Sequence, residues 1–167
     1  YLEAHHAISF KKLIQENDKI TSAYDWLAKT LEQTGDTQGA QDTLMKAVSL
    51  SPKAILRQKA LGDIACKNQD YDTAKHSLKA VVSQGKNSYL KSSSDYTKLA
   101  KVLIDLKDVG ESVAVLDHAT SEFSRDKGAL LNINLAKCRA YKEMNDPEGS
   151  KKALTMAIKL AEDSPER

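Results

Sequence analysis

The chain has 167 residues, and its 25 basic and 23 acidic side chains leave a net charge of only +2. This balance provides no electrostatic footprint for nucleic acid or for an acidic membrane surface, and aromatic residues, at 5%, are too few for a base-stacking platform. No run of about 18 apolar residues is present, which argues against a membrane-spanning helix, and with only 7 Gly and 3 Pro the composition favours helices over many short strands.

The first predicted element is a helix over residues 4–14. Its apolar residues recur at helical spacing and form a stripe of Ala7, Phe10, Leu13 and Ile14. We interpret residues 1–20 as the second helix of a truncated unit, since the chain starts at Tyr1 without a methionine. This interpretation predicts a fragment of a longer protein, with an exposed apolar stripe through which copies self-associate.

A repeated unit begins at residue 21 and is clearest up to residue 54. Its signature residues are Tyr24, Leu27, Ala28 and Leu31, then a break at Gly35-Asp36, then Ala40, Leu44, Ala47 and Pro52. The aspartate of the break recurs as Asp70, Asp108 and Asp146, at spacings of 34, 38 and 38 residues. A period of this size indicates a helix–turn–helix repeat. The predicted units are 21–54, 55–92, 93–130 and 131–167, the last with a C-terminal helix.

Small residues stand at the same two places in each unit, where the two helices of a pair must approach closely. They are Ala28, Gly62, Ala100 and Cys138 in the first helices and Ala40, Ala74, Ser112 and Ser150 in the second helices. Leucines are expected to fill the space between: Leu27, Leu61 and Leu99 from the first helices and Leu44, Leu78, Leu116 and Leu154 from the second. The spacing places each set on one helical face. No unit buries its apolar face alone, so the array requires its neighbours.

The two longer spacings predict extra residues in the connections before the third and fourth units. In the first of these connections, Gly85 is predicted to end a helix in the left-handed conformation, and Ser94 or Asp95 to cap the next helix. In the second connection, Gly128 and Asp126 are predicted to play the same two roles.

The signature positions resemble those of the tetratricopeptide-repeat family across nearly all of the chain. The third unit has Ser112 where Ala is usual, and the fourth has Asn134 and Lys137 where the family prefers a large aromatic residue and Leu. The resemblance implies an all-α fold, a right-handed solenoid of antiparallel helix pairs. It also implies a non-catalytic scaffold that binds a protein or peptide partner.

The same likeness implies where a partner would bind, because first helices line the concave face in this family. The inward positions here are Asp25, Lys29, Lys59, Asp63, Thr97, Lys101, Leu135 and Arg139. Asp25 and Lys29 stand where chaperone-binding members begin their Lys-and-Asn carboxylate clamp, which disfavours a receptor for chaperone tails. The mixed charges predict a partner of mixed charge, and the alternative is a face that is only solvated.

A narrower resemblance concerns residues 23–28 and 51–62, which look like the helical region of bacterial response regulators. Residues 87–88 and 94–96 look like the same subgroup, in which a CheY-like receiver domain precedes tetratricopeptide repeats. This likeness implies a cytoplasmic output or regulatory region in two-component signal transduction. An assembly factor for a pilus or secretion system is the alternative within binding proteins.

Histidines are the remaining candidates for chemistry. His5 and His6 are adjacent, so their side chains point about 100° apart on a helix and do not chelate one ion together. His118 has no second ligand at metal-binding spacing. His76, with Lys79 one turn later, is similar to the motif of histidine phosphotransfer domains, which makes phosphotransfer a competing function. Those domains are four-helix bundles without a 34-residue period, and the repeat register already explains the neighbouring residues as packing.

Cys66 and Cys138 lie on separate predicted units without paired spacing, and we expect free thiols that serve as small packing residues. No catalytic, metal or cofactor site is predicted. Nucleic acid and membranes are not expected among the partners.

Overall fold

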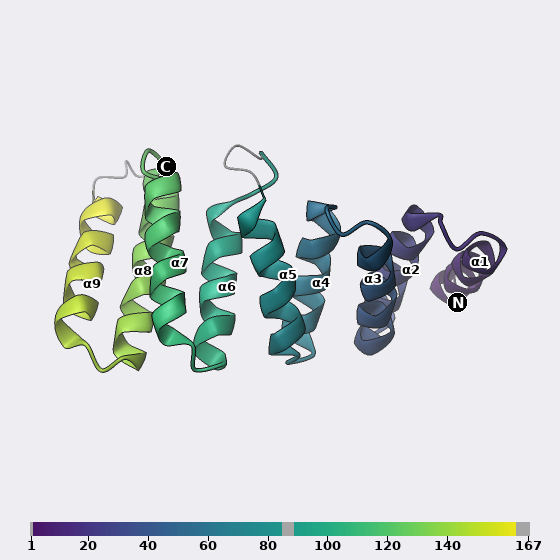
Figure 1. Cartoon of the computed structure of the whole chain (residues 1–167), viewed down its shortest axis with the longest axis horizontal. Helices are drawn as coiled ribbons and strands as arrows, with labels where there is room; N and C mark the ends of the chain where they lie inside the picture. The colour runs from purple at the N-terminus through teal and green to yellow at the C-terminus, as the bar shows by residue number, and fades with distance from the viewer. Residues whose placement is uncertain (1, 85–88, 163–167) are drawn as a thin grey trace. The chain divides into compact units, whose positions relative to one another are not determined.

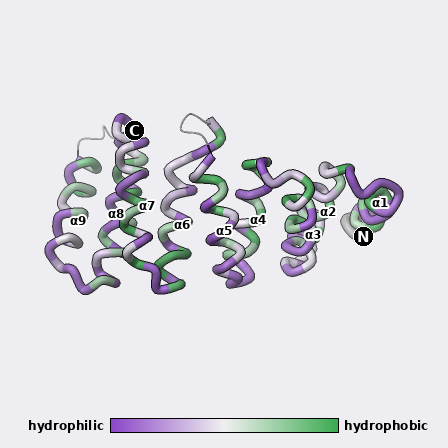
Figure 2. Tube along the Cα trace, in the orientation of Figure 1, coloured by the Kyte–Doolittle hydropathy of each residue, from purple (hydrophilic) through white to green (hydrophobic). Residues whose placement is uncertain are grey.

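The computed structural model describes residues 2–84 and 89–162, which form helices joined by short connections. The helices are α1 (Leu2–Glu16), α2 (Thr21–Gln33), α3 (Thr37–Leu50), α4 (Ile55–Lys67), α5 (Tyr71–Ser83), α6 (Ser93–Asp105), α7 (Val109–Glu122), α8 (Lys127–Glu143) and α9 (Pro147–Glu162). No strand occurs among the described residues, and the predicted all-α fold is confirmed. The two helices of each pair run antiparallel (Figure 1), and hydrophobic and hydrophilic residues alternate along each of them (Figure 2). No helix within the described ranges is both long and apolar enough to cross a membrane.

The chain divides into two compact units, residues 1–81 and 82–167, which we call unit 1 and unit 2. In unit 1, α1 packs on α2, α2 on α3, and α3 on α4. Gly62 of α4 lies against Leu78 of α5, which continues the series. In unit 2, α6 packs on α7 and on α8, α7 packs on α8, and α8 on α9. Each unit is therefore built from helix pairs of the predicted kind.

The turn between the two helices of each pair has one recurring geometry. Its left-handed residue is Gly35, Gln69, Lys107 or Asn145, with φ of 88°, 59°, 65° and 56°. The next residue is an aspartate in every pair, and its N–H donates to the carbonyl five residues earlier at 2.8–2.9 Å. This bond is the long hydrogen bond of the Schellman motif, which satisfies a free carbonyl at the end of the first helix.

Three of these aspartates also begin the next helix. The carboxylates of Asp36, Asp70 and Asp146 accept a hydrogen bond from the N–H three residues later, at 2.8, 3.1 and 2.9 Å. Such a cap typically stabilises a helix by about 1 kcal/mol. The recurrence of aspartate in the sequence thus marks the point where one helix ends and the next begins.

The small residues lie where the helices of a pair meet. Ala28, Ala40, Ala74 and Ala100 are at most 3% exposed. A Cβ at Gly62 would lie 3.0 Å from Cγ of Leu78, so this position has no room for a side chain. In unit 2, the small polar residues form polar contacts across the interface between the two helices of a pair. Ser112 donates to the carbonyl of Ala100 at 3.0 Å, and Cys138 Sγ lies 3.3 Å from Ser150 Oγ.

The end of the array departs from the prediction. Leu154 was expected to pack opposite the first helices, but its side chain is 42% exposed. Helix α9 turns Ala153 and Ala157 inward instead, at 5% and 2% exposure, because α8 is the helix against which it packs. Leu154 lies outside that contact.

The two longer connections also differ from expectation. Helix α8 begins at Lys127, before the predicted boundary at 131, and has 17 residues. The extra residues lengthen a helix, so Gly128 lies in the first turn of α8 and does not end α7. Asp126 caps α8 as predicted, by accepting from the N–H of Ala129 at 2.9 Å.

In the other connection, the N-cap of α6 is Ser92 and not Ser94 or Asp95. Asp95 instead serves as the N3 residue of a capping box, in which its carboxylate accepts from the N–H of Ser92 at 2.8 Å. The predicted helix end at Gly85 lies outside the described residues.

The apolar stripe of α1 is covered more than predicted. Ala7, Phe10 and Ile14 are partly buried and pack against the core of unit 1. The most exposed apolar side chains described in α1 are Ile8 and Leu13, at 64% and 38%. Self-association through α1 therefore stays a prediction, with a smaller apolar surface than the sequence indicated.

Candidate functional site

The predicted partner-binding residues all lie on first helices. Asp25 and Lys29 are on α2, Lys59 and Asp63 on α4, Thr97 and Lys101 on α6, and Leu135 and Arg139 on α8. The first two pairs belong to unit 1 and the other two to unit 2. Each unit therefore carries half of the predicted surface.

In unit 1, Asp25 is held by an arginine that the sequence reasoning did not include. Arg57 of α4 donates from Nε and Nη2 to the two carboxylate oxygens of Asp25, at 2.7 and 2.8 Å. The hydrogen bonds to Asp25 raise the pKa of Arg57 above its ordinary value. Since the bidentate pair joins α2 to α4, the carboxylate of Asp25 supports the array and is not presented alone to a partner. The 32-residue separation, close to one repeat, is the only sequence signal for this pair.

A second cross-helix pair lies two turns further along α2. Lys67 of α4 donates to the carboxylate of Glu32, and this hydrogen bond raises the pKa of Lys67. Both side chains are largely exposed, so the pair is solvated and contributes little to stability. Together the two pairs fix α4 beside α2.

Lys29 differs from the acidic residues of α2 in its surroundings. Its ammonium nitrogen lies 5.3 Å from the ring centroid of Trp26, one turn earlier on the same helix. Trp26 is 55% exposed and stacks on Phe10 of α1, with ring centroids 6.4 Å apart and planes 14° apart. An exposed tryptophan beside a cation is a combination that binding surfaces favour.

These side chains line a hollow of ≈ 370 Å³ between α1 and α2, which we call the aromatic hollow. Its lining residues are His6, Phe10, Trp26, Lys29, Thr30 and Gln33. Only Lys29 of this set was predicted as a binding residue. The sequence reasoning missed the rest because it assigned Phe10 to packing and took from α2 only the two inward positions, Asp25 and Lys29.

In unit 2, the predicted residues lie on two helices that pack side by side, α6 and α8. Lys101, Leu135 and Arg139 are exposed, and the exposed fraction of Leu135 is 47%. Thr97 is half-buried and donates to the carbonyl of Ser94 at 3.1 Å, so its hydroxyl serves the start of α6. The exposed portion of this half thus consists of one apolar side chain and two cations.

Two residues of α8, Asn134 and Lys137, stand where the repeat family prefers a large aromatic residue and a leucine. Lys137 is 13% exposed and its ammonium lies 2.7 Å from a carboxylate oxygen of Asp117 on α7. Asn134 is buried and donates to the carbonyl of Leu130 at 2.8 Å. Where a large aromatic residue and a leucine would fill space by packing, α8 uses an ion pair and a hydrogen bond.

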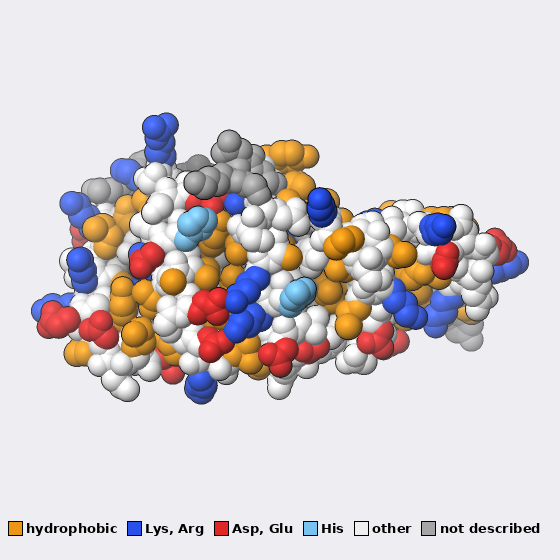
Figure 3. All heavy atoms as spheres, in the orientation of Figure 1, with side chains coloured by type: hydrophobic (Ala, Val, Ile, Leu, Met, Phe, Trp, Pro, Cys, Tyr) orange, Lys and Arg blue, Asp and Glu red, His pale blue; other side chains and the backbone are white. Residues whose placement is uncertain are grey.

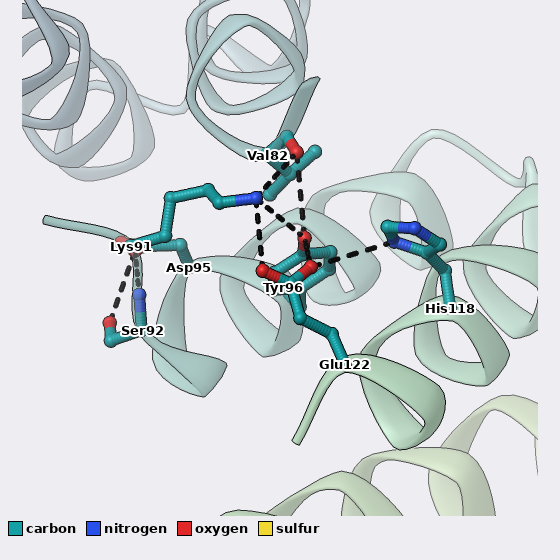
Figure 4. A network of polar contacts seen from close by, with 7 residues as sticks. All are labelled: Val82, Lys91, Ser92, Asp95, Tyr96, His118 and Glu122. Atoms are coloured by element: carbon teal, nitrogen blue, oxygen red, sulfur yellow. Dashed lines mark hydrogen bonds and ion pairs between the residues drawn. The ribbon is translucent and has the colours of Figure 1, made fainter. Parts of the chain in front are cut away.

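A buried polar network lies at the start of unit 2 (Figure 4). Lys91, whose side chain is 3% exposed, lies 3.0 Å from a carboxylate oxygen of Glu122. Tyr96 donates its hydroxyl to the same carboxylate, and the carbonyl of Val82 lies 3.4 Å from that hydroxyl and 3.5 Å from the Lys91 ammonium. The ammonium, the carboxylate and the hydroxyl of these three residues are hydrogen-bonding partners of one another, and each group would be costly to bury without such a partner.

The network shifts the pKa values of its members. Burial acts to raise the pKa of Glu122, but hydrogen bonds from Tyr96 and Lys91 outweigh it, so the pKa lies below the ordinary value. Burial, with the hydrogen bond to Glu122, raises the pKa of Tyr96. His118 Nδ1 lies 4.0 Å from Glu122 at the exposed edge. Every member is engaged within the fold, which makes this a structural network that holds residues 89–92 against α6 and α7.

The other histidines are exposed: His5 and His6 on α1, and His76 on α5. Lys79 is half-buried, one turn after His76. No group of three potential metal-binding side chains occurs in the portion of the chain that the structure describes. On the face drawn in Figure 3, acidic and basic side chains are interspersed with hydrophobic ones, without a large area of one sign.

Comparison with known proteins places residues 21–54 in a sequence profile of the tetratricopeptide repeat. No curated protein sequence matches the chain significantly. Among solved structures, a crystal structure of MamA has a TM-score of 0.72 at 18% identity, covering 93% of this chain and 86% of that one. MamA from Desulfovibrio magneticus RS-1 also has a TM-score of 0.72, at 15% identity, over 98% of this chain and 88% of that one.

A third solved structure is YrrB, described as a TPR protein with an unusual peptide-binding site. Its TM-score is 0.57 at 17% identity, and the match covers 94% of each chain. Likenesses at this level of identity show the fold. They agree with the helix pairs described above.

Proposed function

We propose that this chain, which carries a tetratricopeptide repeat at residues 21–54 and has the fold of tetratricopeptide-repeat proteins, works as a non-catalytic scaffold that binds a protein or peptide partner. The observation that carries the proposal is the set of exposed side chains that the first helices of each unit present, Lys29 in unit 1 and Lys101, Leu135 and Arg139 in unit 2. In unit 2, Leu135 offers an exposed apolar group, and Lys101 and Arg139 offer two exposed cations. In unit 1, Lys29 stands beside an exposed tryptophan.

The partner should carry charges of both signs. On the first helices of unit 1, Lys29 is exposed and Asp25, Lys59 and Asp63 are half-buried, and unit 2 adds the exposed Lys101 and Arg139. Exposed charges of this kind chiefly set the association rate and its salt dependence. Apolar contacts, such as those that Leu135 offers, would supply more of the affinity.

The test is a double charge reversal, Lys59→Glu with Lys101→Glu, compared with a control in which Lys46 and Lys152, exposed on α3 and α9, are reversed in the same way. Helicity by circular dichroism should be the same in all three proteins. We expect the first variant to recover less of the partner from a lysate of the source organism, with a lower salt dependence, while the control recovers the wild-type amount. Equal recovery by all three would place the binding surface elsewhere.

For the biological setting, we propose a regulatory or output region in bacterial two-component signalling, located in the cytoplasm. Support comes from the likeness of residues 23–28 and 51–62 to the helical region of response regulators. A receiver domain with a phosphoacceptor aspartate, in the same protein or as the captured partner, would agree with this setting. A pilus or secretion component as the captured partner would favour the assembly role.

A further inference from the structure

The first helices of unit 2 carry exposed charges in two ranks of opposite sign. Helices α6 and α8 pack side by side, both run antiparallel to α7 (Figure 1), and they end at equivalent C-caps, Leu106 and Met144. We call the exposed residues five positions before these C-caps the cationic rank, and those one position before them the anionic rank: Lys101 with Arg139, and Asp105 with Glu143. Each rank therefore joins equivalent positions of two neighbouring helices.

The four side chains of the ranks have no partner within the fold. Among the residues that the structure describes, none of the four forms an ion pair or a side-chain hydrogen bond. A cation and an anion stand four residues apart on each helix, but the cation comes first, which is the less favourable order for such a pair. Both ranks are therefore available to a partner.

The other cations of these two helices have contacts or positions of their own. Lys137 is paired with Asp117 of α7. Lys98 is engaged within the fold, and Lys142 lines a hollow at the turn between α8 and α9.

The anionic rank is not placed to stabilise its own helices. Both acids stand in the last turn of a helix, where the backbone carbonyls carry partial negative charge and a cation is the favoured residue. The same positions in unit 1 hold Gln33 and Lys67, and the positions five before the C-caps hold Lys29 and Asp63, one charge of each sign. The two ranks are thus a property of unit 2 and not of the repeat.

An exposed apolar side chain lies one turn before the cationic rank. Leu135 is 47% exposed and precedes Arg139 by four residues. Four residues of an α-helix rise by about 6 Å. Along α8 the surface is therefore apolar, then cationic, then anionic, in steps of about 6 Å.

We propose that unit 2 binds an amphipathic α-helix of a partner protein that lies along α6 and α8. The helix places an aliphatic side chain at Leu135, an acidic side chain at the cationic rank and a basic side chain at the anionic rank. This inference rests on the proposed function and specifies the partner for the half of the surface that unit 2 carries. The charges of the two ranks select the order of the partner's side chains.

The spacing and the direction of the partner follow from the same geometry. Residues four apart on a partner helix advance by the same steps of about 6 Å, so three of them stay level with Leu135 and the two ranks. A partner that runs antiparallel to α6 and α8 also sets its dipole favourably against theirs. Its sequence therefore reads Lys-x3-Glu-x3-Leu, or the equivalent basic, acidic and aliphatic residues, from the N-terminus.

Two peptides of identical composition test the order of the charges. Each is an end-capped Ala/Gln peptide of about 18 residues, a length that supports a helix in water, with a fluorophore at one end. The matched peptide contains Lys-x3-Glu-x3-Leu and the exchanged peptide Glu-x3-Lys-x3-Leu, so their net charge and apolar content are equal. Fluorescence anisotropy with the intact chain at low salt should show saturable binding of the matched peptide, tighter by about tenfold than that of the exchanged peptide. High salt should reduce the difference.

Exchange of the two ranks in the protein should reverse the preference. The swapped variant keeps the net charge of the chain and combines Lys101→Glu, Arg139→Glu, Asp105→Lys and Glu143→Lys. It should bind the exchanged peptide more tightly than the matched one. The control variant makes two changes of each sign among exposed residues of α9, namely Lys151→Glu, Lys152→Glu, Glu148→Lys and Glu162→Lys. It should keep the wild-type preference, and circular dichroism checks that both variants retain the fold.

Three results would overturn the proposal: no saturable binding of the matched peptide, equal affinity for the two peptides, or an unchanged preference in the swapped variant. A dimer that sedimentation detects for the wild type and not for the swapped variant would assign the ranks to a second copy of the chain and would overturn it as well. Equal affinity for the two peptides, together with reduced partner capture by the Lys59 and Lys101 variant, would leave the proposed function standing. Failure of this inference and failure of the proposed function are therefore distinguishable.

Discussion

Unit 1 and unit 2 share one repeat but place their ion pairs in different environments. In unit 1, Arg57 and Asp25 are 18% and 40% exposed, and the pair of Lys67 and Glu32 is still more exposed. Pairs of this kind fix one helix beside another without a large contribution to stability, typically about 0–1 kcal/mol each. A partner can replace such contacts at small cost, which suits a binding surface.

In unit 2 one ion pair lies inside the fold. Lys91 is 3% exposed and Glu122 17%, and Tyr96 completes the network. A buried pair adds little net stability while it is intact, but it is costly to break because one charge is left without a partner. The comparison teaches that the same helix pairs can place ion pairs either at an exposed contact between helices or inside their own packing.

The largest expected effect follows from breaking the buried pair. Glu122→Ala leaves the Lys91 ammonium buried without its carboxylate and should lower the free energy of unfolding by about 3 kcal/mol. Urea unfolding measures the loss, and hydrogen exchange of the intact chain should locate it in α6 and α7. The matched change in unit 1, Glu32→Ala, removes an exposed partner and should cost about 0–1 kcal/mol. Equal losses would mean that burial of the pair in unit 2 is not what distinguishes the units.

The second effect concerns the closest helix contact of unit 1. Gly62→Leu places a side chain where even a Cβ would lie 3.0 Å from Leu78, so the helices must separate. We expect a loss of about 1–3 kcal/mol in the free energy of unfolding. Gly110→Ala on α7 is the control, because an added Cβ there meets nothing within 4 Å. A melting temperature unchanged by Gly62→Leu would contradict the assigned position of Gly62 in the repeat.

The third prediction compares the acid sensitivity of the two units. In unit 1, hydrogen bonds from Thr73 and Gln41 hold the pKa of Asp70 below its ordinary value of 3.8. In unit 2 the pKa of Glu122, although burial acts to raise it, is held below 4.5 by Tyr96 and Lys91. A lowered pKa means that the folded state binds protons less readily than the unfolded chain. The stabilisation that each carboxylate gains from its hydrogen bonds is therefore present at pH values above its ordinary pKa. It is lost as the pH falls through the lower pKa that the carboxylate has in the folded state.

Substitutions separate these two contributions. Asp70→Asn should reduce the acid-induced loss of protection in α4 and α5, and Glu122→Gln should reduce it in α6 and α7. Hydrogen exchange of the intact chain between about pH 3 and pH 6 measures both. If each substitution changes the pH dependence of both units equally, the acid sensitivity does not arise from these local hydrogen bonds.

The sequence predicted the helix pairs because packing positions recur with the repeat. Small residues at Ala40, Ala74 and Ser112 and the aspartates of the turns are local, periodic signals, and the structure confirms their burial or their capping roles. The sequence marked the first of these turns by the glycine of its break, but Gln69 and Lys107 adopt the same left-handed conformation without a glycine to mark it. The packing of the two helices therefore sets the left-handed conformation at Gln69 and Lys107, which the residue types alone do not indicate.

The candidate site was less predictable. The pair of Arg57 and Asp25 and the network of Lys91 and Glu122 join residues about 30 positions apart, and no periodic pattern specifies which charge meets which. Trp26 was placed on the correct helix, but its exposure depends on the angle at which α1 crosses α2. Charged side chains are tolerated at many surface positions, so their pairing is fixed only by the folded geometry.

A smaller effect is expected from the exposed pair of unit 1. Asp25→Asn keeps the shape of the side chain and removes its charge. One N–H of Arg57 retains the amide oxygen as its acceptor, and the other faces the amide NH2 group and loses its acceptor. The free energy of unfolding should fall by about 0–1 kcal/mol, and the loss should become smaller still at high salt. Urea unfolding at low and high salt measures both. A loss comparable with that of Glu122→Ala would show that unit 1 depends on its surface ion pairs as strongly as unit 2 depends on its buried one.

The smallest effect is predicted for His76. Its side chain is exposed on α5, and the period of the repeat accounts for its neighbours, with Ser77 and Leu78 buried against Gly62. His76→Ala should therefore leave stability unchanged within about 0.5 kcal/mol and should leave partner capture at the wild-type level. Incubation with a phosphorylated receiver domain, followed by detection of acid-labile phosphate, tests the competing phosphotransfer function directly. Transfer to the wild type that is lost in His76→Ala would make His76 a phosphoacceptor, and unit 1 would then carry chemistry as well as a binding surface.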